Sequence, residues 1–116
     1  MRKIGTLALI GGMTIGMLAA HGEVSKKTER TWKAKCASCH GADGKGQTEQ
    51  GKKLAIADYT TAGWHAGRTD AQIKTAILDG VHTQKDGIKQ DMDGYKDSIS
   101  PEQADELVQL IRSLKK

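Results

Sequence analysis

The chain has 116 residues, a length that suits one domain, and its complement of two Trp, two Tyr and no Phe predicts a thin aromatic core. Its formal net charge is +4 at pH 7, and no basic stretch is interleaved with aromatic residues, which argues against a nucleic-acid-binding protein. A small domain with so few large side chains needs additional apolar mass or a covalent staple to be stable.

The N-terminal segment has the order of a secretory signal peptide. Arg2 and Lys3 give it a positive start, residues 4–20 carry no charge, and small residues follow up to Gly22. We therefore predict a signal peptide over residues 1–22 and a single domain over residues 23–116, located in the periplasm. The alternative is an uncleaved membrane anchor with the domain facing the periplasm, although a 17-residue uncharged segment with four glycines is short for a bilayer span. Without residues 1–22 the chain holds 16 basic and 14 acidic residues, a net charge of +2.

A first helix is predicted from Ser25 to about Cys36. Ser25 is a suitable N-cap, and one helical face recurs at steps of four residues, formed by Val24, Thr28, Trp32 and Cys36. Residues 41–67 are then punctuated by glycines and show no helical periodicity. A stretch of this length without regular structure is unusual inside a compact domain unless it wraps another group.

Two further helices carry clear start signals. Thr69 and Gln72 form a capping box before a buried stripe that contains Ile73, and Gly80 ends this helix. Ser100 and Gln103 form a second box, with Pro101 in the first turn, before an apolar face made of Ala104, Leu107, Val108, Ile111 and Leu114. Residues 81–96 resemble a loop, and no segment shows the alternation of a strand. The predicted fold class is therefore all-α, with three to five short helices joined by long loops.

The segment Cys36-Ala37-Ser38-Cys39-His40 matches the Cys-x-x-Cys-His signature of covalent c-type haem attachment. Two thiols three residues apart can reach the two vinyl-derived carbons on one porphyrin edge, and the next residue presents its imidazole to the iron. A structural zinc site wants four ligands, and beyond this cluster the chain without its predicted signal peptide has no cysteine and only His65 and His82. A redox dithiol would need a βαβ setting, which the sequence does not offer. A plain disulfide would leave the glycine-rich loops and the thin core unexplained. We expect one covalent haem c, whose porphyrin would supply the missing apolar mass.

Residues 28–114 resemble the small soluble class I c-type cytochromes. The resemblance rests on the haem motif with the following Gly41, on Met92, on the helix over residues 69–80, and on the segments Gly44-Lys45-Gly46, Gly51-Lys52-Lys53-Leu54, Asp58-Tyr59-Thr60, Trp64, Tyr95-Lys96-Asp97 and Ser100-Pro101-Glu102. It implies a cytochrome c fold in which the N- and C-terminal helices cross near Trp32 and the loops wrap one covalent haem. It also implies an exposed haem edge and a methionine on the distal side.

Met92 is the candidate for the sixth iron ligand. It is the only methionine that remains once Met1, Met13 and Met17 leave with the predicted signal peptide. A thioether is a soft ligand that favours reduced iron and raises the reduction potential, whereas the alternative role of a lone Met is to fill a gap in the core. Asp93 stands where the family usually has a proline after this methionine.

The proximal side shows a second departure from the family, because Lys52 replaces a proline whose carbonyl often accepts the N–H of the proximal imidazole. A backbone carbonyl near Lys52 or Lys53 is expected to orient His40 instead. The rival iron ligands are His65 and His82, which otherwise read as exposed loop residues. The haem pocket is expected to include Leu54, Tyr59, Trp64, Ile73, Ile77 and Tyr95, although Trp64 is equally consistent with ordinary core packing.

With both axial positions filled by protein, the expected function is electron transfer without enzymatic activity. The alternative is a haem-based catalyst or gas sensor in which Met92 is labile or absent from the iron. Expected partners are redox proteins that dock transiently. Loop lysines at positions 45, 52, 53, 85 and 89 are candidates to steer an acidic partner, and a solvated surface without a specific partner explains them equally well. We expect a monomer that binds no nucleic acid and meets a membrane only through its partners or an uncleaved N-terminal segment.

Overall fold

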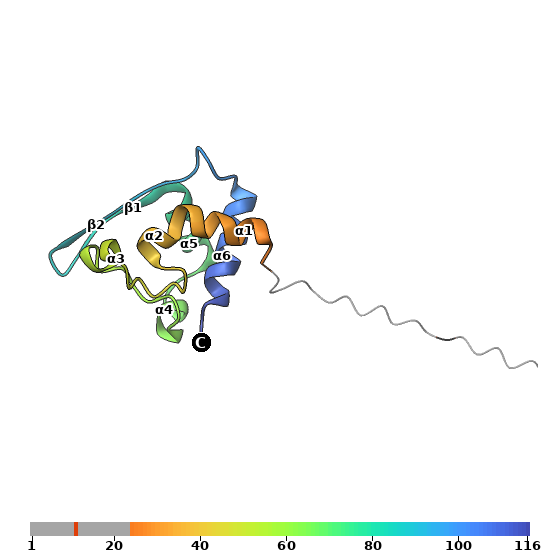
Figure 1. The fold of residues 1–116 in the computed structure, drawn as a ribbon, viewed down its shortest axis with the longest axis horizontal. Helices are drawn as coiled ribbons and strands as arrows, with labels where there is room; N and C mark the ends of the chain where they lie inside the picture. Colours follow the sequence, from red (N-terminus) through yellow and green to blue (C-terminus); the bar gives the residue numbers. More distant parts are fainter. Residues whose placement is uncertain (1–10, 12–23) are drawn as a thin grey trace, which may run out of the picture.

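The computed structural model describes residue 11 and residues 24–116, so the predicted signal peptide lies outside the described residues except for Gly11 and stays a prediction. The elements follow in the order α1 (Lys26–Thr31), η1 (Trp32–Cys36), α2 (Ala37–His40), α3 (Glu49–Lys53), α4 (Ala62–Ala66), α5 (Asp70–Asp79), β1 (Gly80–Lys85), β2 (Ile88–Asp93) and α6 (Pro101–Ser113) (Figure 1). Within the described part, no helix has the length and apolar character needed to cross a bilayer.

The three N-terminal elements form one continuous helical stretch. Ser25 caps it as predicted, since its Oγ accepts a hydrogen bond from the backbone N of Thr28 at 3.2 Å. The middle element, η1, has π-helical hydrogen bonding, and α2 then continues to His40, four residues beyond the predicted end. The haem motif therefore lies on helical turns rather than in a loop.

This N-terminal stretch crosses α6, as the resemblance implied (Figure 1). Trp32 is buried in the core together with Ala104, Leu107 and Val108 of α6. The Thr28 hydroxyl donates to Glu106 Oε2 at 2.6 Å and ties the two helices together at the edge of the crossing. The predicted apolar face of α6 is thus the core face.

Both predicted capping boxes are present, at the starts of α5 and α6. Ile73 and Ile77 of α5 are buried against the same core, and Lys74 pairs with Asp105 of α6 at 2.9 Å. Gly80 ends α5 with a φ of +86°, a backbone conformation that residues with a side chain rarely adopt.

The prediction of a strand-free loop over residues 81–96 was wrong. Strands β1 and β2 form an antiparallel hairpin whose register runs from Gly80 opposite Asp93 to Lys85 opposite Ile88. Asp86 and Gly87 make the two-residue turn with φ of +51° and +79°, as Asp-Gly turns in hairpins do. The strands are mostly polar because the hairpin is largely exposed, so they show no clear alternation of apolar residues.

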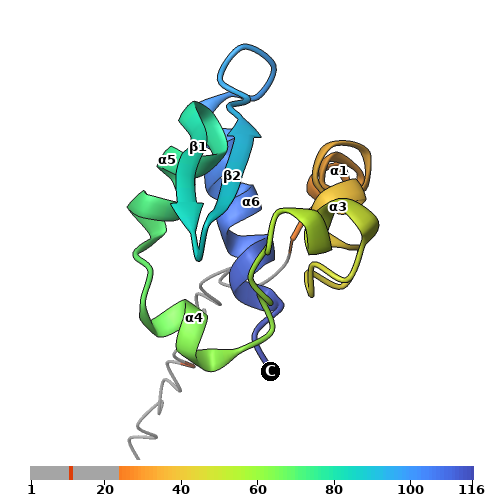
Figure 2. The same ribbon diagram turned by 90° about the vertical axis from the view of Figure 1, so that its left-hand side faces the viewer.

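The prediction of an irregular segment over residues 41–67 was also wrong in part, because it contains the five-residue helices α3 and α4. Helices of this length complete too few turns to show an apolar stripe. Thr48 caps α3 by accepting a hydrogen bond from the backbone N of Gly51 at 2.8 Å. Seen from the side, α5 and the hairpin lie opposite α1 and α3, with α4 below (Figure 2).

Candidate functional site

A cavity of about 670 Å³ lies between the N-terminal helical stretch, α5 and the hairpin. This volume is within the roughly 300–1,000 Å³ that is usual for small-molecule and cofactor sites. Every predicted site residue lines it: Cys36, Cys39, His40, Leu54, Tyr59, Trp64, Ile73, Ile77, Met92 and Tyr95. The structure thus brings together side chains that are spread over 60 residues of sequence.

One wall of the cavity is the haem motif. Cys36 and Cys39 are free, half-buried thiols, and burial raises the pKa of Cys36 to about 11, so this thiol is protonated near neutral pH. The indole Nε1 of Trp32 donates to the carbonyl of Gly41 at 3.1 Å, which fixes the chain where it leaves α2. Both thiols therefore face the cavity from a helix anchored in the core.

His40, at the end of α2, presents a neutral imidazole. Burial lowers its pKa, and its ring stacks on Tyr59 with centroids 5.1 Å apart and planes inclined by 25°. Its Nδ1 is buried and finds no hydrogen-bond partner among the described residues. A buried neutral imidazole at a cavity wall is a suitable metal ligand, because the charged form that would compete with the metal is disfavoured.

The expected carbonyl from Lys52 or Lys53 does not reach His40, so this prediction was wrong. The carbonyls at this end of α3 have other donors: Gly51 O accepts from Ile56 N at 3.0 Å, and Lys52 O accepts from Ala55 N at 3.4 Å. These carbonyls are therefore used by backbone hydrogen bonds within the turn that follows α3. Stacking against Tyr59, rather than a hydrogen bond, is what orients the imidazole.

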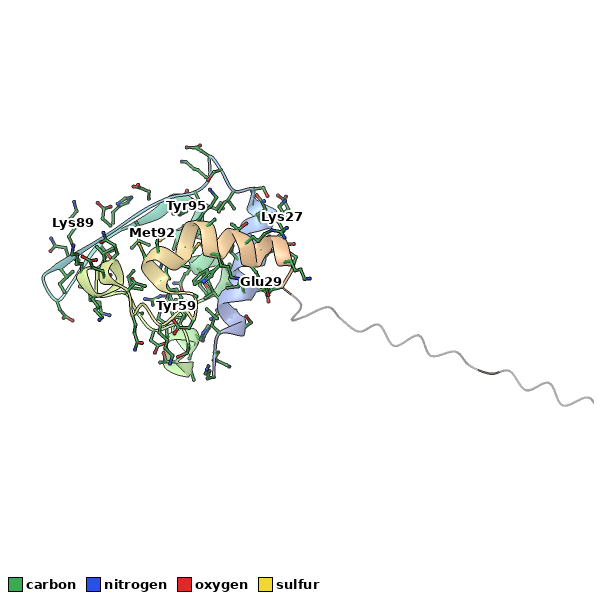
Figure 3. All side chains as sticks on the ribbon, viewed as in Figure 1. Lys27, Glu29, Tyr59, Lys89, Met92 and Tyr95 are labelled. Atoms are coloured by element: carbon green, nitrogen blue, oxygen red, sulfur yellow. The ribbon has the colours of Figure 1, made fainter. Side chains whose placement is uncertain are left out.

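Met92 lines another wall of the same cavity, from strand β2, where it lies opposite Val81. Figure 3 labels Met92 on the hairpin together with Tyr59 and Tyr95, which line the cavity with it. Among the described residues, Met92 is neither in the buried core cluster nor packed against it. This position argues against a gap-filling role and for a role at the cavity.

Neither of the rival histidines lines the cavity. His65 was expected to be an exposed loop residue, but it lies in α4, is only 8% exposed, and its Nε2 bonds to the carbonyl of Tyr59 at 2.7 Å. His82 is exposed, as expected, and its Nδ1 lies 2.5 Å from Asp91 Oδ1. In the described structure, Met92 is therefore the better placed partner for His40.

Trp64 stands at the cavity with its ring against Tyr59, the centroids being 4.2 Å apart. The guanidinium of Arg68 lies 5.7 Å from the centre of the Trp64 ring and also lines the cavity. No pattern in the sequence pointed to Arg68. It places a positive charge at a site expected to hold the anionic propionates of haem.

The role of Arg112 in α6 was not predicted from the sequence either. Its guanidinium donates to the carbonyls of His65 and Arg68 at 3.0 and 2.6 Å, and to Asp70 Oδ1 at 2.8 Å. These bonds fasten α6 to the chain between α4 and α5, which brings Trp64 and Arg68 to the cavity. Its Nη1 also lies 3.1 Å from His65 Nδ1. Sequence periodicity does not predict such a residue, because its partners, two backbone carbonyls and two side chains, lie 42 to 47 residues away.

The cavity as a whole fits a covalently attached haem. It offers two free thiols and a neutral imidazole on one wall, a thioether on another, aliphatic and aromatic lining between them, and one cation. A sulfur and a nitrogen donor facing one apolar cavity are suited to hold a low-spin iron.

Comparisons with known proteins agree with this geometry. A family model described as Cytochrome c matches residues 25–115. A solved structure named KustC0563 c-type cytochrome is 28% identical, with a TM-score of 0.64, and the match covers 77% of this chain and 98% of that chain. A point mutant of the same cytochrome matches with 27% identity, a TM-score of 0.62, and coverage of 76% and 98%. No curated protein matches the chain.

Proposed function

Because the chain belongs to the cytochrome c family, and so binds haem c covalently with its iron, we propose that it is an exported carrier of single electrons. The observation that carries this proposal is the convergence of Cys36, Cys39, His40 and Met92 on one cavity. Family members are generally electron carriers, and the arrangement of donors in this chain suits that activity.

In this proposal the thiols of Cys36 and Cys39 add to the two vinyl groups of the porphyrin. Each addition forms one carbon–sulfur bond and moves the thiol hydrogen to the neighbouring vinyl carbon, so no oxidant or reductant is consumed. His40 and Met92 would supply the two protein donors that hold the iron. Bound haem c supplies an iron ion that changes its charge by one electron.

The surrounding residues keep the site unreactive toward small molecules. With His40 and Met92 both holding the iron, no coordination position would be left for a substrate, an arrangement that suits electron transfer without a bound substrate. Ile73 and Ile77 exclude water from one side, since both are buried in the core beside the cavity. A dry site with a thioether ligand favours the reduced form and raises the potential.

We further propose that redox partners dock transiently near the cavity opening. Lys85 lines the cavity and is exposed, as is Lys89, and on the α3 side of the cavity Lys52 and Lys53 are exposed too. Such a group of cations would steer a partner with an acidic surface, and the electron-transfer rate should then fall as ionic strength rises. The protein would act as a monomer in the periplasm.

The test is a spectroscopic redox titration of the wild type beside Met92→Ala. We expect the wild-type ferric protein to be low-spin, with the weak near-infrared sulfur-to-iron band, and its ferrous form to resist CO. Met92→Ala should lose the band, shift the potential downward and bind CO at neutral pH. Ile88→Ala, an exposed aliphatic position on the same strand, is the matched control and should leave all three properties unchanged.

A wild type that lacks the band and binds CO readily would favour the alternative of a haem-based catalyst or gas sensor. The export proposal has a separate test, the mass of the mature protein from the native host. Cleavage after Gly22 should leave residues 23–116 plus one haem, whereas an intact N-terminus would indicate an anchored protein.

A further inference from the structure

The hairpin that carries Met92 is exposed over most of its length. Among its residues, only Gly80, Val81, Gln90 and Met92 are partly shielded from solvent, and all the others are exposed. A two-stranded hairpin is marginally stable by itself in water. Something else must hold the hairpin against the cavity.

Gln90 makes the long-range contact of this hairpin. Its side-chain Nε2 donates to the carbonyl of Leu54 at 3.0 Å and to the carbonyl of Ala55 at 3.1 Å, 36 and 35 residues earlier in the chain. These carbonyls belong to the turn that follows α3, on the far side of the cavity from α5. The two bonds therefore span the cavity opening from the hairpin to α3.

The orientation of the Gln90 amide is fixed from within the hairpin. Thr83 lies opposite Gln90 in the register, and its hydroxyl donates to Gln90 Oε1 at 3.4 Å. With the oxygen occupied by Thr83, the nitrogen is directed at the two carbonyls. Both hydrogens of the amide nitrogen are then used.

Gln90 and Met92 are two residues apart on β2, so both side chains leave the strand on the face that lines the cavity. The base of the hairpin is fixed separately, because Tyr95 donates its hydroxyl to the carbonyl of Lys35 at 2.9 Å. Between that base and the turn at Asp86, Gln90 attaches β2 to the turn that follows α3. Met92 lies in the part of β2 between these two attachments.

We infer that Gln90 is a positioning residue for the distal ligand, which clamps the hairpin to the α3 turn and so keeps the Met92 thioether at the iron. This inference rests on the proposed ligation by Met92. When the clamp opens, the hairpin pivots about its base and Met92 leaves the iron. The frequency of that opening sets how readily an external ligand such as CO can bind.

The size of the effect follows from the two hydrogen bonds. One intramolecular hydrogen bond typically changes an equilibrium constant by a factor of roughly 2 to 12, so two change it by about 5- to 150-fold. The apparent affinity for CO is proportional to the small fraction of protein in which the iron is accessible. Loss of the clamp should raise that affinity by the same factor.

The experiment compares ferrous Gln90→Leu with the wild type and with Gln84→Leu, all as purified holoproteins at neutral pH. Leu keeps much of the bulk of Gln but has no donor. Gln84 is the matched control, since it is an exposed glutamine on the same hairpin with no side-chain hydrogen bond to the described residues. We expect the affinity for CO to rise at least fivefold, and the near-infrared band to weaken, in Gln90→Leu alone.

Thr83→Val provides a second variant that removes only the bond orienting the amide. It should shift both properties in the same direction by a smaller factor, and it keeps the inference testable if Gln90→Leu does not accumulate. Unchanged CO affinity in both variants, with a normal wild-type band, would overturn the role of Gln90 alone. A wild type without the band would overturn Met92 ligation, and this inference with it.

Discussion

Arg112 offers the sharpest prediction about stability. In the described structure its guanidinium donates hydrogen bonds to the backbone carbonyls of His65 and Arg68 and to the carboxylate of Asp70. Arg112→Leu removes these three bonds and the 3.1 Å contact of Arg112 Nη1 with His65 Nδ1, while keeping an apolar side chain on α6. The variant leaves the two carbonyls without this donor in a half-buried place, so the change should cost more than the loss of a surface charge.

The magnitude follows from exposure. The Arg112 side chain is 24% exposed, so each carbonyl bond contributes about 1 kcal/mol, below the usual range for a charged donor. The Asp70 side chain is 62% exposed, and its ion pair adds about 0.5 kcal/mol. The free energy of unfolding should therefore fall by about 2–3 kcal/mol. For a domain of this size the melting temperature should fall by roughly 10–20 °C.

The assay is urea unfolding of the ferric holoprotein, followed by far-ultraviolet circular dichroism. Arg30→Leu is the control, because Arg30 is an exposed arginine on α1 with no ion pair or side-chain hydrogen bond to the described residues. It should change the unfolding free energy by less than about 0.5 kcal/mol. Equal midpoints for the two variants would refute the idea that Arg112 fastens α6 to the α4–α5 segment.

Three further predictions concern other parts of the fold. Trp32→Phe removes the indole bond to Gly41 and part of a buried ring, and should lower the free energy of unfolding by about 1–3 kcal/mol in the same urea assay, whereas an unchanged midpoint would contradict the core position of Trp32. Burial raises the pKa of Tyr59 to about 12, above its value of about 10 in an unfolded chain, so the contribution of Tyr59 to stability should be fully present below pH 10 and be lost as pH rises toward 12. The tyrosinate absorbance that is lost in Tyr59→Phe should therefore titrate near pH 12, and a step near pH 10 would contradict this burial. Gly87→Ala forces a left-handed φ of +79° on a residue with a side chain, at a place where the added methyl group meets no other atom within 4 Å. It should cost about 1–2 kcal/mol in hairpin opening, seen as faster amide exchange in β1 and β2 but not in α6.

The helices with complete start signals were predictable from the sequence. Ser25, Thr69 and Ser100 cap their helices because side-chain oxygens and backbone donors lie within three residues of each other, and such local bonds leave a visible pattern. The crossing of the first and last helices, with Trp32 in the core, followed from the family resemblance and is confirmed. The cytochrome c family and its covalent haem are confirmed as well.

The hairpin was missed because most of its residues face solvent, so its sequence carries no apolar alternation. The Asp86-Gly87 pair was the available signal, since these residues adopt the positive φ values that a tight hairpin turn needs. Met92 lines the cavity although its segment is a strand and not the predicted loop. The hairpin does change how that residue is held.

Contacts between distant residues were beyond prediction from one sequence. His65 reads as a loop residue by its glycine-rich neighbours, yet its burial depends on Arg112 and on the carbonyl of Tyr59. The missing carbonyl partner of His40 likewise depends on how the α3 turn closes on itself. Each of these outcomes is set by packing between segments, which leaves no trace in local spacing.

The π-helical turn at η1 has a consequence for how this protein tolerates changes in length. On its N-terminal side, Thr28 is held against α6, and on its C-terminal side, Cys39 and His40 face the cavity. The wide turn accommodates one extra residue between these two sets of side chains. Deleting the exposed Ala34 would restore ordinary helical winding and leave the two sets in nearly the same relative orientation, because the π-turn already holds the residue that is removed. The exposed stretch Lys33–Lys35 should therefore tolerate the loss of one residue, whereas an insertion there would rotate Thr28 relative to His40 by about 100°, a difference that exposure alone does not predict.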